Sequence, residues 1–131
     1  MTLVVDASLI VAALIDTGPV GAWATTLVAA EPLVAPHLMP VEVTNILRRS
    51  EAAGDITPDN ATLALEDLVA LPVDLVPYLP FAARVWQVRG NLTAYEAWYV
   101  AVAEGLNVAL ATLDARLARA PGLRCEVLLP R

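Results

Sequence analysis

Four acidic residues stand where a folded chain could bring their carboxylates together: Asp6, Glu42, Glu96 and Asp114. Asp6 directly follows a short apolar run, and Asp114 lies three residues beyond another. Glu42 and Glu96 each fall in the first turn of an expected helix. Three of the four have strongly apolar neighbours, in the stretches VVDASLIVAAL, PHLMPVEVTNIL and LATLDARLA. These acids are the chain's best candidates for chemistry.

Several carboxylates within a few Å of one another cannot all stay ionised without a cation. Oxygen ligands of this kind suit Mg²⁺ or Mn²⁺. Two such ions, roughly 3.5–4 Å apart, would activate a water and stabilise the leaving oxygen of a phosphodiester. We therefore expect the oxygens of Asp6, Glu42 and Asp114 to converge closely enough to share one ion. We also expect like-charge repulsion to raise the pKa of at least one of them.

Each acid also has a simpler interpretation. Asp6 and Asp114 precede helical stretches and could be N-caps. Glu42 could be a first-turn acid favoured by the helix dipole. Thr93-Ala-Tyr-Glu96 has the spelling of a capping box, which would account for Glu96 without any ligand role. The sequence leaves these alternatives open.

The composition excludes several classes of enzyme. The chain has 131 residues, of which 58% are hydrophobic and 17% charged. Its eight basic residues are all Arg, against fourteen acids, for a net charge of −6. Without Lys it cannot carry P-loop, class A β-lactamase or pyridoxal-phosphate chemistry. A single His and the lack of a Gly-X-Ser-X-Gly motif argue against a Ser-His-Asp triad. Because an acidic chain repels nucleic acid, a metal would have to supply positive charge locally.

Further features bear on the chain's surroundings. Its single cysteine rules out an internal disulfide framework and most zinc sites, and favours a reducing compartment. No apolar run reaches the ~18–20 residues of a membrane span. The N-terminus lacks the basic region of a signal peptide. We expect a cytoplasmic protein with no membrane association.

Apolar runs and helix signals alternate along the chain. We expect strands at 3–5, 33–35, 73–76, 108–111 and 126–129. We expect helices at about 7–14, 20–30, 40–53, 58–71, 80–89, 94–105 and 115–120, with Pro80 opening one and Gly105 ending another. This alternation predicts a parallel sheet covered on both faces. The four acids then gather at the carboxyl edge of the sheet, where sites form in such folds.

Three stretches carry a family resemblance: VVDASLIVAAL, APHLMPVEVTNILRR and NLTAYEAWYVAVAEGLNVALATLDARLA. In this order and spacing they resemble the PIN domain, and more narrowly the VapC-type toxins of bacterial type II toxin–antitoxin systems. The resemblance implies a single PIN domain over residues 1–131. It also implies an α/β fold, a three-layer α/β/α sandwich around a mostly parallel sheet of about five strands.

The resemblance places the family's acids on Asp6, Glu42, Glu96 and Asp114, as catalytic and metal-binding residues for Mg²⁺ or Mn²⁺. The hydroxyls of Ser8 and Thr112 would support them. Glu96 departs from the family pattern, which usually has Asp after the Tyr, so a second metal site is in doubt. Two further supporting residues come from position alone. Asn45 shares a helix face with Glu42, and Arg116 is a candidate for phosphate contact.

The activity implied is that of a toxin, a metal-dependent endoribonuclease that hydrolyses RNA phosphodiester bonds with a metal-activated water. The implied partners are an RNA substrate, a cognate antitoxin and a second copy of the chain. The assembly would be a homodimer, or a heterotetramer or larger with antitoxin, that meets operator DNA only through the antitoxin. The alternative, favoured by Glu96, is a weakly active or non-catalytic PIN-fold binding protein that acts through its antitoxin complex and operator DNA.

Overall fold

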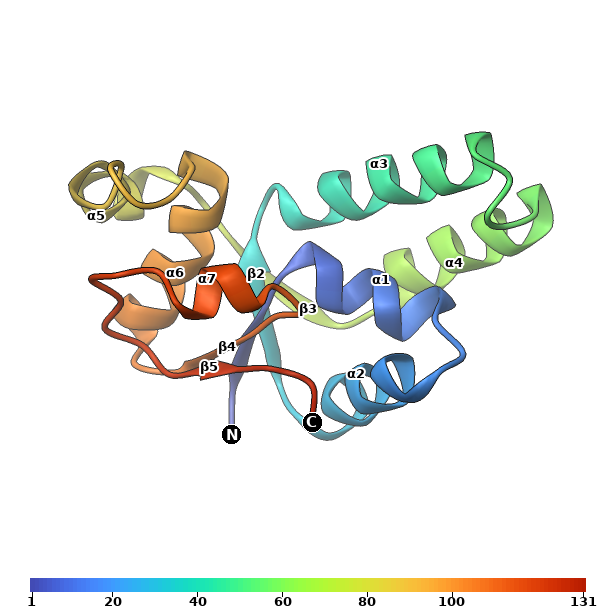
Figure 1. Ribbon diagram of the computed structural model, residues 1–131, viewed down its shortest axis with the longest axis horizontal. Coiled ribbons are helices and arrows are strands. Elements are labelled where there is room, and N and C mark those ends of the chain that lie inside the picture. Colours follow the sequence, from blue (N-terminus) through green and yellow to red (C-terminus); the bar gives the residue numbers. More distant parts are fainter.

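A computed structural model describes residues 1–131 and has a five-stranded sheet at its centre (Figure 1). The strand order is β3-β2-β1-β4-β5, and every neighbouring pair is parallel. The strands are β1 (Leu3–Val5), β2 (Leu33–Pro36), β3 (Val73–Val76), β4 (Ala109–Ala111) and β5 (Val127–Leu128). The expected parallel sheet is confirmed, with strand bounds within two residues of those predicted.

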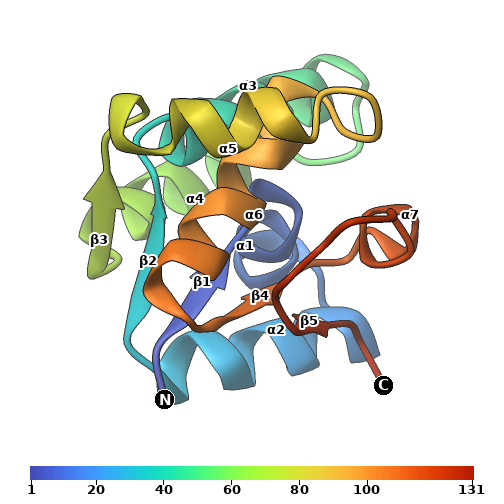
Figure 2. The ribbon, with the colours of Figure 1, turned by 90° about the vertical axis from the view of Figure 1, so that its left-hand side faces the viewer.

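Seven α-helices surround the sheet. They are α1 (Ala7–Ile15), α2 (Pro19–Ala30), α3 (Met39–Ala52), α4 (Pro58–Ala70), α5 (Ala82–Gln87), α6 (Ala94–Leu106) and α7 (Ala115–Ala118). Figure 1 shows α1 to α4 on one side of the sheet, with α5, α6 and α7 on the other. Figure 2 shows α6 crossing the central strands, against which it packs. This three-layer arrangement confirms the expected α/β/α fold.

The central strands are apolar because both of their faces are covered. All three residues of β1 have no exposed surface, and β4 is buried throughout. A strand buried on both faces reads as a continuous apolar run rather than an alternating one. The edge strand β3, Val73–Val76, is partly exposed and accommodates Asp74. The short apolar runs in the sequence therefore mark the middle of the sheet.

Two helix boundaries differ from those expected. Helix α6 continues through Gly105 to Leu106, and its C-cap Asn107 has a φ of 56°, in the left-handed region. Asn tolerates this conformation because its short side chain can hydrogen-bond locally. The chain at Pro80 forms a 3₁₀ turn, Leu79–Phe81, before α5 begins at Ala82, and α5 ends at Gln87, short of Arg89. Gly105 therefore marked the end of α6 to within one residue, whereas Pro80 lies in a 3₁₀ turn and does not open α5.

The register of the sheet fixes where the acidic residues lie. Val5 of β1 pairs with Ala111 of β4, so the residues that follow, Asp6 and Thr112, leave the sheet side by side. The backbone N–H of Asp6 donates to the carbonyl of Ala111 at 3.3 Å. Strand β2 ends beside β1 and leads into α3, which carries Glu42. Three of the four acids thus follow strands that end at one edge.

No single helix is long and apolar enough to cross a membrane; α1 and α2 together would be, but their axes are bent by 108°.

Candidate active site

A cavity of about 220 Å³ lies at the carboxyl edge of the sheet, and all four predicted acids line it. Its wall is formed by residues from β1–α1, α3, α6 and β4–α7: Asp6, Ala7, Ser8, Glu42, Ile46, Tyr95, Glu96, Tyr99, Asp114 and Leu117. Residues more than 100 positions apart in the sequence meet here. We call this feature the acidic cavity.

Asp6 is the most enclosed of the four acids, with 9% of its surface exposed. Its Oδ1 accepts hydrogen bonds from the hydroxyl of Ser8 at 2.7 Å and from the backbone N–H of Leu9 at 3.0 Å. Its Oδ2 accepts a very short hydrogen bond from the hydroxyl of Thr112, which is itself fully buried. Asp6 is therefore the N-cap of α1 and also a fixed wall of the cavity.

Ser8 and Thr112 connect the start of α1 to the β4–α7 turn as well as supporting Asp6. The Ser8 hydroxyl accepts from the backbone N–H of Leu113 at 3.3 Å, and the Thr112 hydroxyl accepts from that of Asp114 at 3.0 Å. Both hydroxyls thus donate to Asp6 and accept from the β4–α7 turn. This arrangement fixes Asp114 relative to Asp6.

Glu42 is half-buried, in the first turn of α3, and is held from across the cavity. The Tyr99 hydroxyl donates to Glu42 Oε1 at 2.7 Å. Tyr99 belongs to α6 and has only 5% of its surface exposed, so the bond connects two helices on opposite sides of the sheet. Glu42 is positioned by Tyr99 in addition to its own helix.

Asp114 and Glu96 each use one carboxylate oxygen to cap a helix. Asp114 Oδ1 accepts from the N–H groups of Arg116 and Leu117, at 2.9 and 3.2 Å, at the start of α7. Glu96 Oε1 accepts from the N–H of Thr93 at 3.0 Å, while the Thr93 hydroxyl accepts from the N–H of Glu96 at 3.1 Å. The capping box of α6 is therefore complete.

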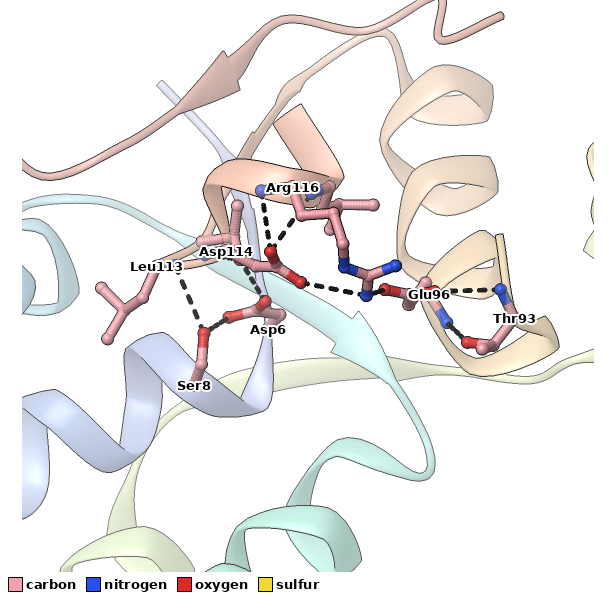
Figure 3. A network of polar contacts seen from close by, with 9 residues as sticks. Asp6, Ser8, Thr93, Glu96, Leu113, Asp114 and Arg116 are labelled. Carbon is pink, nitrogen blue, oxygen red and sulfur yellow. Dashed lines mark hydrogen bonds and ion pairs between the residues drawn. The ribbon is translucent and has the colours of Figure 1, made fainter. Parts of the chain in front are cut away.

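The second oxygens of these two acids share one guanidinium. Arg116 Nη2 lies 2.5 Å from Glu96 Oε2 and 3.5 Å from Asp114 Oδ2. Figure 3 shows the Arg116 side chain reaching from α7 between Asp114 and Glu96. Arg116, predicted as a phosphate contact, is thus paired with acids of the site.

Burial and neighbouring charge act on the buried acids in the same direction. Burial raises the pKa of Asp6, opposed by its hydrogen bonds from Thr112, Ser8 and Leu9, with a further small increase from Asp114. Burial also raises the pKa of Glu42, against the hydrogen bond from Tyr99, and Asp6 adds to the increase. The expected raised pKa values are present, but desolvation contributes more than like-charge repulsion.

The expected convergence of Asp6, Glu42 and Asp114 on one point is not found. No three His, Cys, Asp or Glu side chains are arranged to hold one metal ion. The physical reason is that the chain's own donors hold these carboxylates at the cavity wall: hydroxyls at Asp6, Tyr99 at Glu42, and helix N–H groups with Arg116 at Asp114. The acids share a cavity without forming a finished ligand set.

Asn45 is the predicted supporting residue that neither lines the cavity nor bonds to one of its acids. It is exposed, and its Oδ1 accepts from Nε of Arg48 at 3.0 Å, one turn along α3. Asn45 and Glu42 do lie in the same helix, as their spacing of three residues predicted. The α3 residue that lines the cavity beside Glu42 is instead Ile46, four residues further on.

The donor set nevertheless suits a hard divalent cation. The acidic side chains of the cavity offer oxygen ligands only, and no histidine or cysteine is among the lining residues. Asp6 increases the electrostatic cost of ionising Glu42, and Asp114 increases that of ionising Asp6, a cost that a bound cation would relieve. Mg²⁺ keeps several of its waters and needs few protein oxygens, and carboxylate oxygens are the ligands it prefers.

Two tyrosines line the cavity in addition to the predicted site residues. Tyr99 lies in the middle of an apolar helix, a position typical of a core residue. Its position three residues after Glu96 was the available signal, since i and i+3 share a helix face. Tyr95 lines the cavity with 60% of its surface exposed. Nothing in its immediate sequence distinguishes it from an ordinary surface tyrosine.

Comparison with known proteins gives one consistent result. The PIN domain family model matches residues 3–123. The chain is 41% identical to Ribonuclease VapC1 of Mycobacterium tuberculosis over 129 residues, which cover 98% of this chain and 97% of that protein.

Solved structures show the same fold. One is VapC20 of Mycobacterium tuberculosis, described as a sarcin–ricin loop cleaving toxin, with a TM-score of 0.69 and 15% identity over 92% of this chain and 95% of that one. Another is VapBC2 of Rickettsia felis bound to a DNA fragment from its promoter, with a TM-score of 0.68 and 12% identity over 97% and 98% of the two chains.

Proposed function

This chain belongs to the PIN domain family and, within it, to the VapC ribonucleases, and from that premise we propose a Mg²⁺- or Mn²⁺-dependent endoribonuclease that acts as the toxin of a type II toxin–antitoxin system. The observation that carries the proposal is the acidic cavity, which four separated segments build from Asp6, Glu42, Glu96 and Asp114. An RNA substrate places the activity in the cytoplasm.

We assign the metal to oxygens of Asp6, Glu42 and Asp114, with Glu96 as the fourth ligand. When bound, the ion supplies the positive charge that this chain of net charge −6 lacks, polarising a water and neutralising the substrate phosphate. Ser8 and Thr112 hold Asp6 in place by donating to its two oxygens. Tyr99 does the same for Glu42. A carboxylate with a raised pKa is a better proton acceptor, and burial raises the pKa of Glu42.

The direct test is cleavage of RNA by the purified chain with Mn²⁺, with Mg²⁺ and with EDTA. Cleavage should require the ion, and the Asp6→Asn substitution should abolish cleavage. Asp59→Asn, an acid in the first turn of α4 away from the cavity, is the matched control and should cleave as the wild type does. Metal-independent cleavage, or a fully active Asp6→Asn, would contradict the proposed mechanism. End-mapping of cellular RNA after brief expression would then identify the target.

The proposed protein partner is a cognate antitoxin, and an apolar groove offers it a surface. The groove, of about 420 Å³, lies between α3, α4 and β3 and is lined by Met39, Pro40, Val41, Thr44, Leu65, Leu68, Val69, Leu71, Val73 and Leu75. Val69 and Val41 are 80% and 62% exposed. We assign the groove to an apolar antitoxin helix, because the acidic toxin would also attract a basic segment adjoining that helix.

Helix α3 lies between the groove and the acidic cavity, so one antitoxin chain could contact both. We propose that an Arg or Lys of the antitoxin reaches Asp6, Glu42 or Asp114 and inhibits cleavage. The complex would meet operator DNA through the antitoxin, as the VapBC2 structure with promoter DNA suggests. Changing that basic residue to Ala should release cleavage while the complex stays assembled.

We also propose that the toxin forms a homodimer, and a heterotetramer or larger assembly with antitoxin. Large apolar side chains remain exposed away from the groove, including Leu79 at 81% and Trp86 at 67%. Apolar surface of this kind is typical of interaction sites. Sedimentation of the antitoxin-free chain at micromolar concentration should show a dimer; a monomer alone would contradict this part of the proposal.

A second function is favoured by one observation. Glu96 Oε1 completes a capping box and Oε2 pairs with Arg116, so both of its oxygens have partners within the chain. A cavity with only three acids available to a metal would suit a weakly active or non-catalytic PIN-fold protein that acts through its antitoxin and operator DNA. That protein would bind antitoxin and show no metal-dependent cleavage in the assay above.

A further inference from the structure

We infer that Arg116 is an exchangeable internal counter-ion: its guanidinium holds the second oxygens of Glu96 and Asp114 until a divalent cation replaces it. The inference rests on the proposed metal site and assigns that site a regulator within the same chain. Figure 3 shows the three side chains together.

The division of oxygens between partners carries the argument. Glu96 Oε1 and Asp114 Oδ1 are bound to backbone N–H groups that the helices α6 and α7 need for their first turns. The oxygens that remain for a ligand are Glu96 Oε2 and Asp114 Oδ2, and Arg116 Nη2 contacts both, at 2.5 and 3.5 Å. Arg116 therefore competes with a cation for the same two atoms.

The electrostatics of the cavity explain why such a counter-ion is useful. Asp6 is buried in it and Glu42 is half-buried, and the pKa of each is raised partly by a neighbouring carboxylate. No Lys is present in the chain, and Arg116 is the only basic residue that forms an ion pair with an acid of the cavity. Without a metal, Arg116 balances the charges of Glu96 and Asp114.

The contact is also easy to break. The Arg116 side chain is 69% exposed, so water can solvate the guanidinium as soon as it leaves the carboxylates. Exposed ion pairs of this kind contribute little, because solvent screens them. By contrast, Arg84 pairs with Glu104 at 2.6 Å with only 19% of its side chain exposed, as expected of a permanent structural pair. Arg116 has the exposure of an exchangeable partner.

The experiment compares Mn²⁺ binding to three metal-free proteins by calorimetry: the wild type, Arg116→Ala and Arg119→Ala. Arg119 is an exposed arginine at the end of α7, and its removal changes the net charge equally. We expect Arg116→Ala to bind Mn²⁺ about two- to fivefold more tightly than Arg119→Ala, which is the range for one exposed ion pair. Arg116→Lys, which keeps a charge without the planar fork, should fall between wild type and Arg116→Ala.

Thermal unfolding separates this role from a merely structural one. Arg116→Ala should melt below the wild type in EDTA, and the difference should shrink at saturating Mn²⁺, because the cation then holds the same oxygens. Equal or weaker Mn²⁺ binding by Arg116→Ala, with an equal loss of melting temperature in both conditions, would overturn the inference while leaving the metal site intact. Absence of Mn²⁺ binding in all the proteins would instead overturn the proposed site, and the inference with it.

Discussion

The acidic cavity and the apolar groove lie on two faces of the same helix and differ in almost every property. Glu42 and Ile46 of α3 face the cavity, whereas Met39, Val41 and Thr44 face the groove. The groove is the larger, about 420 against 220 Å³, yet it contains no titratable side chain. We therefore propose the smaller space as the site of the chemistry and the larger one as the site of association.

The two faces follow from the helical period. Residues 42 and 46 are one turn apart, as are 40 and 44, and the two pairs point in different directions. One helix can thus present a carboxylate to a substrate site and apolar side chains to a partner.

The largest expected effect is a loss of RNA cleavage that leaves antitoxin binding unchanged. Asp6→Asn should lower RNA cleavage by at least about 100-fold, since residues that only support a metal ligand already contribute about 10- to 100-fold. Antitoxin binding through the groove should be retained, as measured by calorimetry with the purified partner. Loss of both functions together would show that the regions are not separable.

The reciprocal change lies in the groove. Val69→Asp places a charge on a side chain that is 80% exposed in the free protein and would be covered in the complex. We expect antitoxin affinity to fall by more than about tenfold, because burying an unpaired charge is costly, while cleavage is unchanged. Val69→Thr is the control, with similar shape and no charge. Unchanged antitoxin affinity in Val69→Asp would remove the groove from the interface.

A smaller effect is expected from Tyr99→Phe, which removes one hydroxyl. Burial and the bond to Glu42 raise the pKa of Tyr99, so its hydroxyl remains protonated and donates to Glu42 at any ordinary pH. Without it, Glu42 loses the contact that positions it across the cavity. We expect cleavage to fall by roughly 10-fold, the lower end for a residue that orients a ligand, and Mn²⁺ affinity to fall in parallel. Tyr95→Phe should leave Mn²⁺ affinity unaffected.

The pH dependence of stability distinguishes the acidic cavity from the groove, because only the cavity contains a buried carboxylate. The pKa of Asp6 in the folded protein is raised above the ordinary 3.8. At pH values between 3.8 and the raised pKa, the folded protein therefore binds more protons than the unfolded one. The free energy of unfolding contributed by Asp6 therefore falls as pH rises through that window. In EDTA, the wild type should lose stability relative to Asp6→Asn as pH rises from about 4 toward neutrality. The Val69→Asp variant should not become more stable relative to the wild type as pH rises.

The sequence predicted the sheet and the acids that line the cavity better than it predicted the side-chain contacts between cavity residues. Fully buried strands leave continuous apolar runs, and the register that places Asp6 beside Thr112 follows from parallel pairing. Asp6, Glu42, Glu96 and Asp114 were therefore found from position alone. The Tyr99–Glu42 bond and the Arg116 bridge depend on side chains from different elements. No local spacing encodes such contacts.

The capping alternatives illustrate the same limit. For Asp6, Glu96 and Asp114 the sequence allowed either a cap or a ligand, and the structure shows a cap at all three. A carboxylate has two oxygens, so capping with one leaves the other for a ligand at Glu96 and Asp114. The two interpretations were alternatives in the sequence but are compatible in space.

The smallest expected effect tests that compatibility at Glu96. Glu96→Asp shortens the side chain by one methylene, so the carboxylate no longer reaches the Thr93 N–H, and helix α6 should lose about 0.5–1 kcal/mol of stability. The shorter acid is the usual residue of the family at this position, so cleavage at saturating Mn²⁺ should be kept or raised. Thermal unfolding in EDTA and single-turnover cleavage measure the two effects separately.

Glu96→Gln is the matched variant, because Gln also completes a capping box but carries no charge. It should keep the melting temperature close to that of the wild type and lose cleavage if Glu96 is a ligand. The opposite pattern, with Glu96→Gln fully active and Glu96→Asp only less stable, would restrict Glu96 to the helix cap. The acidic cavity would then act with three ligands, and Arg116 would have only Asp114 left to exchange.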